Sequence, residues 1–190
     1  MVAEFSSNYQ HHFDRFLDRL GRERLGARNP AVLIAAGVVA YHRTKETSME
    51  VLPDARALLD DLKRTGTRIG ILSDGLQVKQ AEKLIRLRVL PYLDPGAIFF
   101  SDQLGVSKPN PKIFVKACQA MQVAPERVLY VGDRPTHDVV PAAQAGLNTV
   151  LYRGAGGKYS EQACPVTPDH DVRDLRDLTP VLRERYGLPV

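Results

Sequence analysis

Hydrophobic and polar positions follow two different patterns along this chain, and the change between them divides it. Residues 6–20 and 31–47 carry apolar side chains at helical spacing, and a linker rich in Gly, Arg, Asn and Pro separates them. From residue 53 onward, short runs of strand-forming residues alternate with helical stretches. We therefore expect a helical part over residues 1–50 and a larger part over residues 51–190.

The larger part shows a regular alternation of elements. The pattern predicts helices at 53–65, 77–90, 111–121, 137–145 and 174–186, and strands at 67–72, 97–100, 128–131 and 148–152. Short connections between alternating strands and helices favour a parallel sheet with helices on both faces. We expect a three-layer, Rossmann-like α/β fold.

Composition excludes several classes of protein. The 26 basic and 22 acidic residues give a net charge of +4, but the densest basic group, residues 15–28, is interleaved with acids, so we expect no nucleic-acid partner. The longest apolar stretch, residues 31–41, is too short to span a bilayer. The two cysteines suggest neither a disulfide framework nor a zinc site. These features favour a cytoplasmic protein without a membrane partner.

A pair of acids follows one of the predicted strands. The apolar run from Val128 ends at Gly132-Asp133, and Asp138 follows five residues later, where a helix should start. This places two carboxylates at the carboxyl end of a buried strand, where open α/β sheets bind ligands. Adjacent carboxylates repel unless a cation lies between them, and oxygen ligands suit Mg²⁺. The alternative is structural, with Asp133 in a turn and Asp138 capping a helix.

A second strand ends in a turn with hydrogen-bonding groups. The strand at 67–72 stops at Ser73-Asp74-Gly75, before a helix that begins near Gln77. A hydroxyl and free backbone N–H groups at such a turn can cradle an anion. The alternative is a tight turn in which Ser73 or Asp74 caps the helix.

A lysine occupies a third loop. Lys108 directly precedes Pro109, which disfavours helix for the lysine and allows one to start soon after it. A lysine held at a loop end can neutralise a carboxylate and a phosphoryl group together. The alternative is an ordinary solvated surface lysine.

In order, Ser73-Asp-Gly, Lys108-Pro-x-Pro-x-x-Phe and Gly132-Asp-x-x-x-x-Asp resemble the second, third and fourth motifs of the haloacid dehalogenase-like hydrolase superfamily, over roughly residues 51–152. The resemblance implies that Ser73 hydrogen-bonds the phosphoryl group and that Lys108 steadies the nucleophile and the transferred group. It implies substrate contacts from Ser73-Asp74-Gly75 and Lys108, ligation of Mg²⁺ by Asp133, and support of the metal site by Asp138. Residues 6–14 and the following helix resemble part of the helical cap of a phosphatase-like subgroup, so residues 1–50 are expected to be a partial cap.

The first motif of this superfamily is missing. An apolar strand followed by Asp-x-Asp-x-Thr/Val supplies the nucleophile and the general acid/base, and no such segment occurs in this sequence. Asp169-His-Asp171 has the acid spacing, but Val172-Arg173 follows it and two prolines precede it, so it reads as a late edge strand or loop.

The superfamily places its first strand between the strands that end at Ser73 and Asp133. Without it, each unpaired backbone group in the core costs ~1–3 kcal/mol. We expect that the true start lies upstream of Met1; the alternative is a variant that fills the gap with a partner strand or by repacking.

These observations favour a Mg²⁺-dependent phosphatase that acts on a small phosphorylated metabolite through an aspartyl-phosphate, with the 190-residue chain itself inactive. One alternative is a non-catalytic domain that binds a phosphorylated ligand or a protein. Another is a 2-haloacid dehalogenase, which the intact acid pair disfavours. The oligomeric state stays open.

Overall fold

The computed structural model describes residues 12–154 and 157–190. The chain divides into two compact units, Met1–Glu50 and Val51–Val190. Residues 6–11 of the helix predicted at 6–20 lie outside the described residues. Within the described ranges, no helix combines the length and hydropathy needed to cross a bilayer.

The first unit consists of helices. Its elements are α2 (His12–Leu20), α3 (Arg22–Leu25) and α4 (Pro30–Thr47). Asn29 caps α4, because its Oδ1 accepts the N–H of Ala31 at 2.9 Å and Pro30 occupies the first turn. Gly37 lets α2 pack closely against α4, since a Cβ there would lie 2.6 Å from a ring carbon of Phe13. The short helix α3 falls within the predicted linker.

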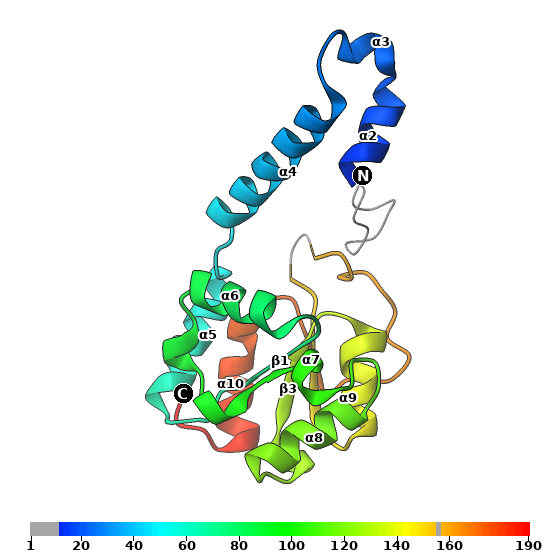
Figure 1. The fold of residues 1–190 in the computed structure, drawn as a ribbon. Helices are drawn as coiled ribbons and strands as arrows, with labels where there is room; N and C mark the ends of the chain where they lie inside the picture. The colour runs from blue at the N-terminus through cyan, green and yellow to red at the C-terminus, as the bar shows by residue number, and fades with distance from the viewer. Residues whose placement is uncertain (1–11, 155–156) are drawn as a thin grey trace. The chain divides into compact units, whose positions relative to one another are not determined.

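The second unit alternates strands and helices, as predicted (Figure 1). Its helices are α5 (Pro53–Arg64), α6 (Gln77–Arg86), α7 (Ser101–Leu104), α8 (Lys112–Met121), α9 (Val140–Gln144) and α10 (Leu178–Tyr186). Its strands are β1 (Ile71–Ser73), β2 (Ile98–Phe100), β3 (Leu129–Gly132), β4 (Asn148–Tyr152) and β5 (His170–Val172). Short 3-10 helices connect them: η1 (Leu90–Tyr92), η2 (Pro95–Ala97), η3 (Pro125–Arg127) and η5 (Leu175–Asp177).

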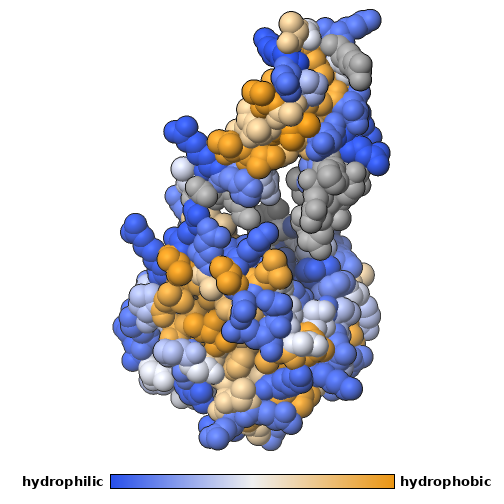
Figure 2. Space-filling model, viewed as in Figure 1, coloured by the Kyte–Doolittle hydropathy of each residue, from blue (hydrophilic) through white to orange (hydrophobic). Residues whose placement is uncertain are grey.

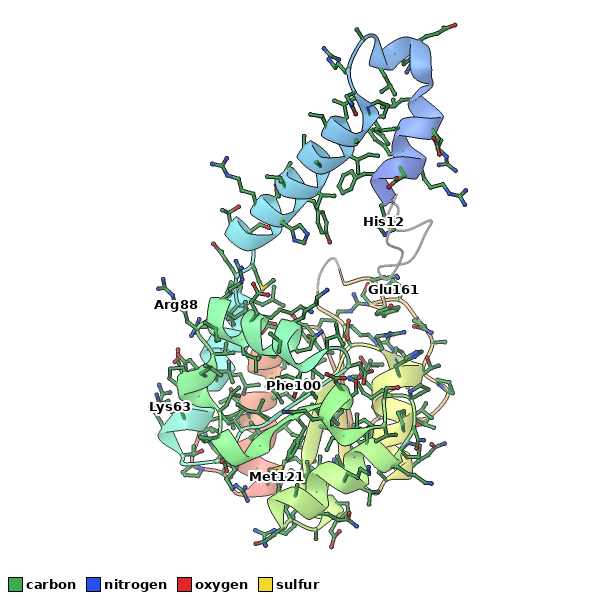
Figure 3. All side chains as sticks on the ribbon, in the orientation of Figure 1. His12, Lys63, Arg88, Phe100, Met121 and Glu161 are labelled. Atoms are coloured by element: carbon green, nitrogen blue, oxygen red, sulfur yellow. The ribbon has the colours of Figure 1, made fainter. Side chains whose placement is uncertain are left out.

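Helices cover both faces of the strands. Side chains alternate along a strand, so Leu129 of β3 packs with α5 and α10 while its neighbour Tyr130 packs with α8 and α9. In β1, Ile71 packs on the side of α6, and its neighbour Leu72 packs on the side of α8. Phe100 of β2 fills the interior, whereas Lys63 and Arg88 lie on the outside (Figure 3). The predicted three-layer α/β fold with parallel strands is confirmed.

The strands form two separate parallel sheets. β1 pairs only with β2, and the other sheet has the order β3-β4-β5. Within the described ranges, no strand pairs with the free edge of β1 or of β3. Val131 of β3 is 39% exposed, which is unusual for a strand between helical layers. We call this discontinuity between β1 and β3 the seam; it coincides with the position at which the resemblance puts the superfamily's first strand.

Several boundaries differ from the predictions. The helix predicted at 77–90 ends at Arg86, and the one predicted at 174–186 begins as the 3-10 helix η5. The strand predicted at 67–72 is shorter and is shifted to Ile71–Ser73. The helix predicted from His137 begins as a π-helix, η4 (Pro135–Val139), before α9. Pro141 has no N–H to donate to the carbonyl of residue 137, which favours a wider turn there. The segment around Asp171 is confirmed as an edge strand, β5.

Apolar side chains also lie on the outer surface of the second unit. Figure 2 shows them over α6, where Leu76, Val78 and Ile85 are 57%, 75% and 62% exposed. In the first unit, Val32 and Val39 of α4 are 65% and 66% exposed. Among the described residues, these side chains remain exposed to solvent.

Candidate active site

The turn after β1 is fixed by side chains from other segments. Gly75 has φ of 122°, a conformation that favours glycine. Its N–H donates to Ser101 Oγ at 3.0 Å, and the N–H of Gln77 donates to Asp102 Oδ2 at 3.2 Å. The prediction of free N–H groups at this turn is therefore wrong for these two, because the first turn of α7 binds them.

Ser73 and Asp74 also have partners. The Ser73 hydroxyl donates to Gln80 Oε1 at 3.2 Å, and Asp74 Oδ1 accepts the backbone N–H of Lys108 at 3.1 Å. Ser73 must release Gln80 before its hydroxyl can donate to a phosphoryl oxygen. Asp74 thereby holds the loop that carries the lysine.

Lys108 lies outside any helix, as predicted, with α8 beginning at Lys112. Its Nζ donates to Asp138 Oδ1 at 2.6 Å and to the hydroxyl of Tyr130 at 3.1 Å. The side chains of Lys108 and Asp138 are 13% and 5% exposed, so the ion pair is screened little by water. An ammonium group has three donors, and two of them are used here.

Lys108 also links the two sheets. Its backbone N–H bonds to Asp74, which follows β1, and its ammonium bonds to Asp138, which follows β3. Hydrogen bonds between strands do not cross the seam within the described residues. The contacts of Lys108 therefore join the two sides of the seam at the carboxyl ends of the strands.

Asp138 is held from three directions. Its Oδ1 accepts from Lys108 and from the Tyr130 hydroxyl, and its Oδ2 accepts the backbone N–H of Arg134 at 3.1 Å. Gly132 makes room for it, because a Cβ at Gly132 would lie 2.4 Å from the Cβ of Asp138. Asp138 is thus a buried anchor, and the lysine is its cation.

Asp133 is placed differently. It lies exposed at the rim, and no hydrogen bond joins its carboxylate to another of the described residues. Loss of hydration raises the pKa of Asp133, and the charge of Asp138 raises it further. The ionised form is therefore less favoured than in a free aspartate, and a nearby cation would favour it again.

The donor set suits an open Mg²⁺ site. The described residues contain no cluster of three or more His, Cys, Asp or Glu side chains that could enclose a metal. Mg²⁺, however, is usually held by one or two carboxylates together with water and substrate phosphate. Asp133 fits that pattern as the protein's carboxylate, whereas both oxygens of Asp138 are already bonded to the protein.

Sequence reasoning missed Tyr130. Its ring packs edge-on against Phe114, with centroids 4.8 Å apart at 88°, and its hydroxyl bridges Lys108 and Asp138. Burial and the charge of Asp138 raise the pKa of Tyr130, so it stays a neutral donor. A tyrosine inside an otherwise aliphatic strand was the available signal, because a buried hydroxyl needs a partner.

Comparison with known proteins identifies the family of this chain. The family model of haloacid dehalogenase-like hydrolases matches residues 2–146. The chain is 40% identical over 187 residues to a glyceraldehyde 3-phosphate phosphatase of Methanopyrus kandleri, covering 97% of this chain and 76% of the relative. It is 39% identical to the protein of the same name from Pyrococcus furiosus, covering 98% and 75%.

Solved structures give the same result. A haloacid dehalogenase-like (HAD) phosphatase from Thermococcus onnurineus is 30% identical to this chain, with a TM-score of 0.61. The match covers 70% of this chain and 58% of that one. A HAD family hydrolase from Deinococcus radiodurans shares the fold with a TM-score of 0.73 at 18% identity, over 99% and 81%. The chain belongs to the haloacid dehalogenase-like hydrolase family.

Proposed function

We propose that this protein serves the Mg²⁺-dependent hydrolysis of a small phosphate monoester in the cytoplasm, with Ser73, Lys108, Asp133 and Asp138 at the site. The observation that carries the proposal is the buried Lys108–Asp138 pair beside Asp133, at strand ends that meet on one rim. The relatives named above suggest glyceraldehyde 3-phosphate as the first substrate to test.

Each residue has a part that its contacts allow. The third donor of the Lys108 ammonium is available to a phosphoryl oxygen while the other two stay on Asp138 and Tyr130. Ser73 exchanges the neutral oxygen of Gln80 for a charged phosphoryl oxygen, which is the stronger acceptor. Asp133 would hold the Mg²⁺, which when bound neutralises charge on the phosphoryl oxygens.

The nucleophile is the missing part. The sequence has no Asp-x-Asp-x-Thr segment after a strand, so we propose that the 190-residue chain does not turn over substrate. A strand carrying that segment and lying in the seam would bring its aspartate between Ser73 and Asp133. The carboxylate would attack phosphorus and release the alcohol, and water would then hydrolyse the aspartyl-phosphate.

The test compares the chain with a version extended at its N-terminus by an apolar strand and Asp-x-Asp-x-Thr. We expect phosphate release from p-nitrophenyl phosphate and from glyceraldehyde 3-phosphate only for the extended version, and only with Mg²⁺. Changing the first added aspartate to asparagine is the matched control and should abolish release. Mg²⁺-dependent turnover by the 190-residue chain would refute its proposed inactivity; an inactive extended version would refute the phosphatase.

The missing motif also favours a second candidate, a non-catalytic domain that binds a phosphorylated ligand or a protein. That function predicts an inactive extended version that still binds phosphate. Dehalogenation of a 2-haloacid would instead appear as EDTA-resistant activity of the extended version on chloroacetate. Asp133 and Asp138 count against it, because a metal-free reaction has no use for a metal ligand.

We further propose that residues 1–50 form part of a helical cap. The support is the composition of α4, whose apolar Val32, Val39 and Tyr41 are exposed among the described residues. An extended version that supplied more cap helices should protect these residues from solvent, which hydrogen exchange along α4 would detect.

A further inference from the structure

Two cations lie on one tyrosine beside the candidate metal ligand. Arg134 directly follows Asp133, and its guanidinium carbon lies 4.8 Å from the centre of the Tyr159 ring. The Nζ of Lys158 lies 5.3 Å from the centre of the same ring. Like charges repel, so gathering two of them on one ring needs a structural reason.

Hydrogen bonds fix the loop that carries Lys158 and Tyr159. Arg153, at the end of β4, donates from Nη1 to the carbonyls of Ser160 at 2.7 Å and Gln162 at 2.9 Å. The N–H of Gln162 also donates to the carbonyl of Tyr159 at 3.0 Å. Because β3 and β4 are paired and parallel, the ends that carry Arg134 and Arg153 lie on the same rim.

The acids of this region are engaged elsewhere. Asp171 binds Arg153 at 2.8 Å, and Glu161, which Figure 3 labels on the same loop, pairs with Arg173 at 3.3 Å. Asp138 accepts the backbone N–H of Arg134, not its side chain. Among the described residues, neither Arg134 nor Lys158 has an acid at ion-pair distance.

The remaining acid is Asp133, the candidate metal ligand. Arg134 directly follows Asp133 in the chain, so its side chain leaves the backbone at the same end of β3 as the candidate ligand. A guanidinium stacked on a ring keeps its N–H groups at its edge, where they can bind two oxygens of one anion.

We propose that Arg134 and Lys158, positioned by Tyr159, bind an oxyanion of the substrate beside Asp133. This deepens the proposed function and rests on it. The oxyanion is either the phosphoryl group itself or a second anionic group on the same molecule, such as a carboxylate. Tyr159 is a positioning residue, because it acts by fixing the two cations.

The experiment measures binding by titration calorimetry, with Mg²⁺ present and at fixed ionic strength. The probes are inorganic phosphate, glycerol 3-phosphate with one anionic group, and 3-phosphoglycerate with two. The variant is Arg134→Gln, and the matched control is Arg127→Gln. Arg127 is exposed and precedes β3, so it removes the same charge from the opposite end of the same strand.

We expect Arg134→Gln to weaken binding of at least one probe about tenfold, and the control to change it less than about twofold. A loss with phosphate identifies the phosphoryl group as the anion, and a loss with 3-phosphoglycerate alone identifies the second group. Unchanged affinities, or an equal loss in the control, would overturn the proposal.

Variants of Tyr159 separate positioning from charge. Tyr159→Phe keeps the ring and should bind as the unaltered chain does, whereas Tyr159→Leu should weaken binding although both cations remain. If Tyr159→Phe and Tyr159→Leu bound the probes equally well, Tyr159 would not position the two cations. If the unaltered chain bound none of the probes, the proposed function would fail as well; binding that Arg134→Gln leaves intact would refute the inference alone.

Discussion

Replacing Lys108 by methionine tests the arrangement at the seam most directly. Methionine keeps much of the length of the side chain but leaves the Asp138 carboxylate, only 5% exposed, without its cation. The hydroxyl of Tyr130 and the N–H of Arg134 would still donate to that carboxylate. The variant therefore removes charge neutralisation while most of the hydrogen bonding stays.

The expected loss is large relative to the stability of a domain. At 2.6 Å the pair attracts by about 6 kcal/mol with an effective dielectric constant of about 20, and the cost of removing both charges from water cancels part of this. Removal of one partner of a buried pair typically costs about 3–5 kcal/mol. We expect the lower end, about 3 kcal/mol, because two hydrogen bonds to Asp138 remain.

Urea unfolding followed by circular dichroism measures this loss as a lower midpoint. The matched control is Arg173→Met, which breaks an ion pair with Glu161 whose side chains are 69% and 77% exposed. Such a surface pair should contribute less than about 1 kcal/mol. Asp138→Asn and the double variant complete a cycle, in which the double variant should lose less stability than the two single losses added together.

A Lys108→Met chain within about 1 kcal/mol of the unaltered one would refute this reasoning, as would a cycle without coupling. Either result would mean that the seam is held by side-chain packing alone.

Three further predictions follow from single contacts at the site. Asp133→Asn should raise stability at pH 7 without Mg²⁺, because the raised pKa of Asp133 means that its charge is unfavourable in the fold; the gain in urea midpoint should shrink as the pH falls through the raised pKa and vanish well below 3.8, where Asp133 is protonated in both the folded and the unfolded chain. Gly132→Ala should cost about 1–3 kcal/mol in urea unfolding, since its Cβ would lie 2.4 Å from that of Asp138, whereas Gly96→Ala, with a nearest contact of 3.4 Å, should cost less than about 1 kcal/mol. Tyr130→Phe should cost about 1 kcal/mol in the same assay, because it removes a hydroxyl that donates to one buried charge and accepts from another; no change would mean that water replaces it.

The features that the sequence predicted well depend on local patterns. The strand before Asp133 is an apolar run with a sharp end, so its type and its carboxyl end could both be read from the residues. Lys108 could be placed on a loop because Pro109 disfavours helix for the residue before it. The burial of the lysine against Asp138 needed tertiary structure, because the two residues are 30 positions apart.

Other features could not be read locally. The N–H groups after Ser73 are taken by Ser101 and Asp102, which follow a different strand, and no pattern near residue 73 indicates this. Arg153 holds the loop of Tyr159 through backbone carbonyls, an interaction that leaves no signature in residue types. The start of β1 was predicted too early, because Thr67 and Arg68 resemble strand residues but pair with no neighbouring strand.

The double attachment of Lys108 bears on how this protein can evolve. One residue supplies the ammonium that the proposed chemistry needs and also fastens the two halves of the core to each other. Substitution at position 108 is therefore limited both by the proposed chemistry and by the stability of the core. A descendant that lost phosphate chemistry would still be under selection to keep a cation there. A lysine retained at this position in a lineage is thus no sign, by itself, that the lineage has kept its activity.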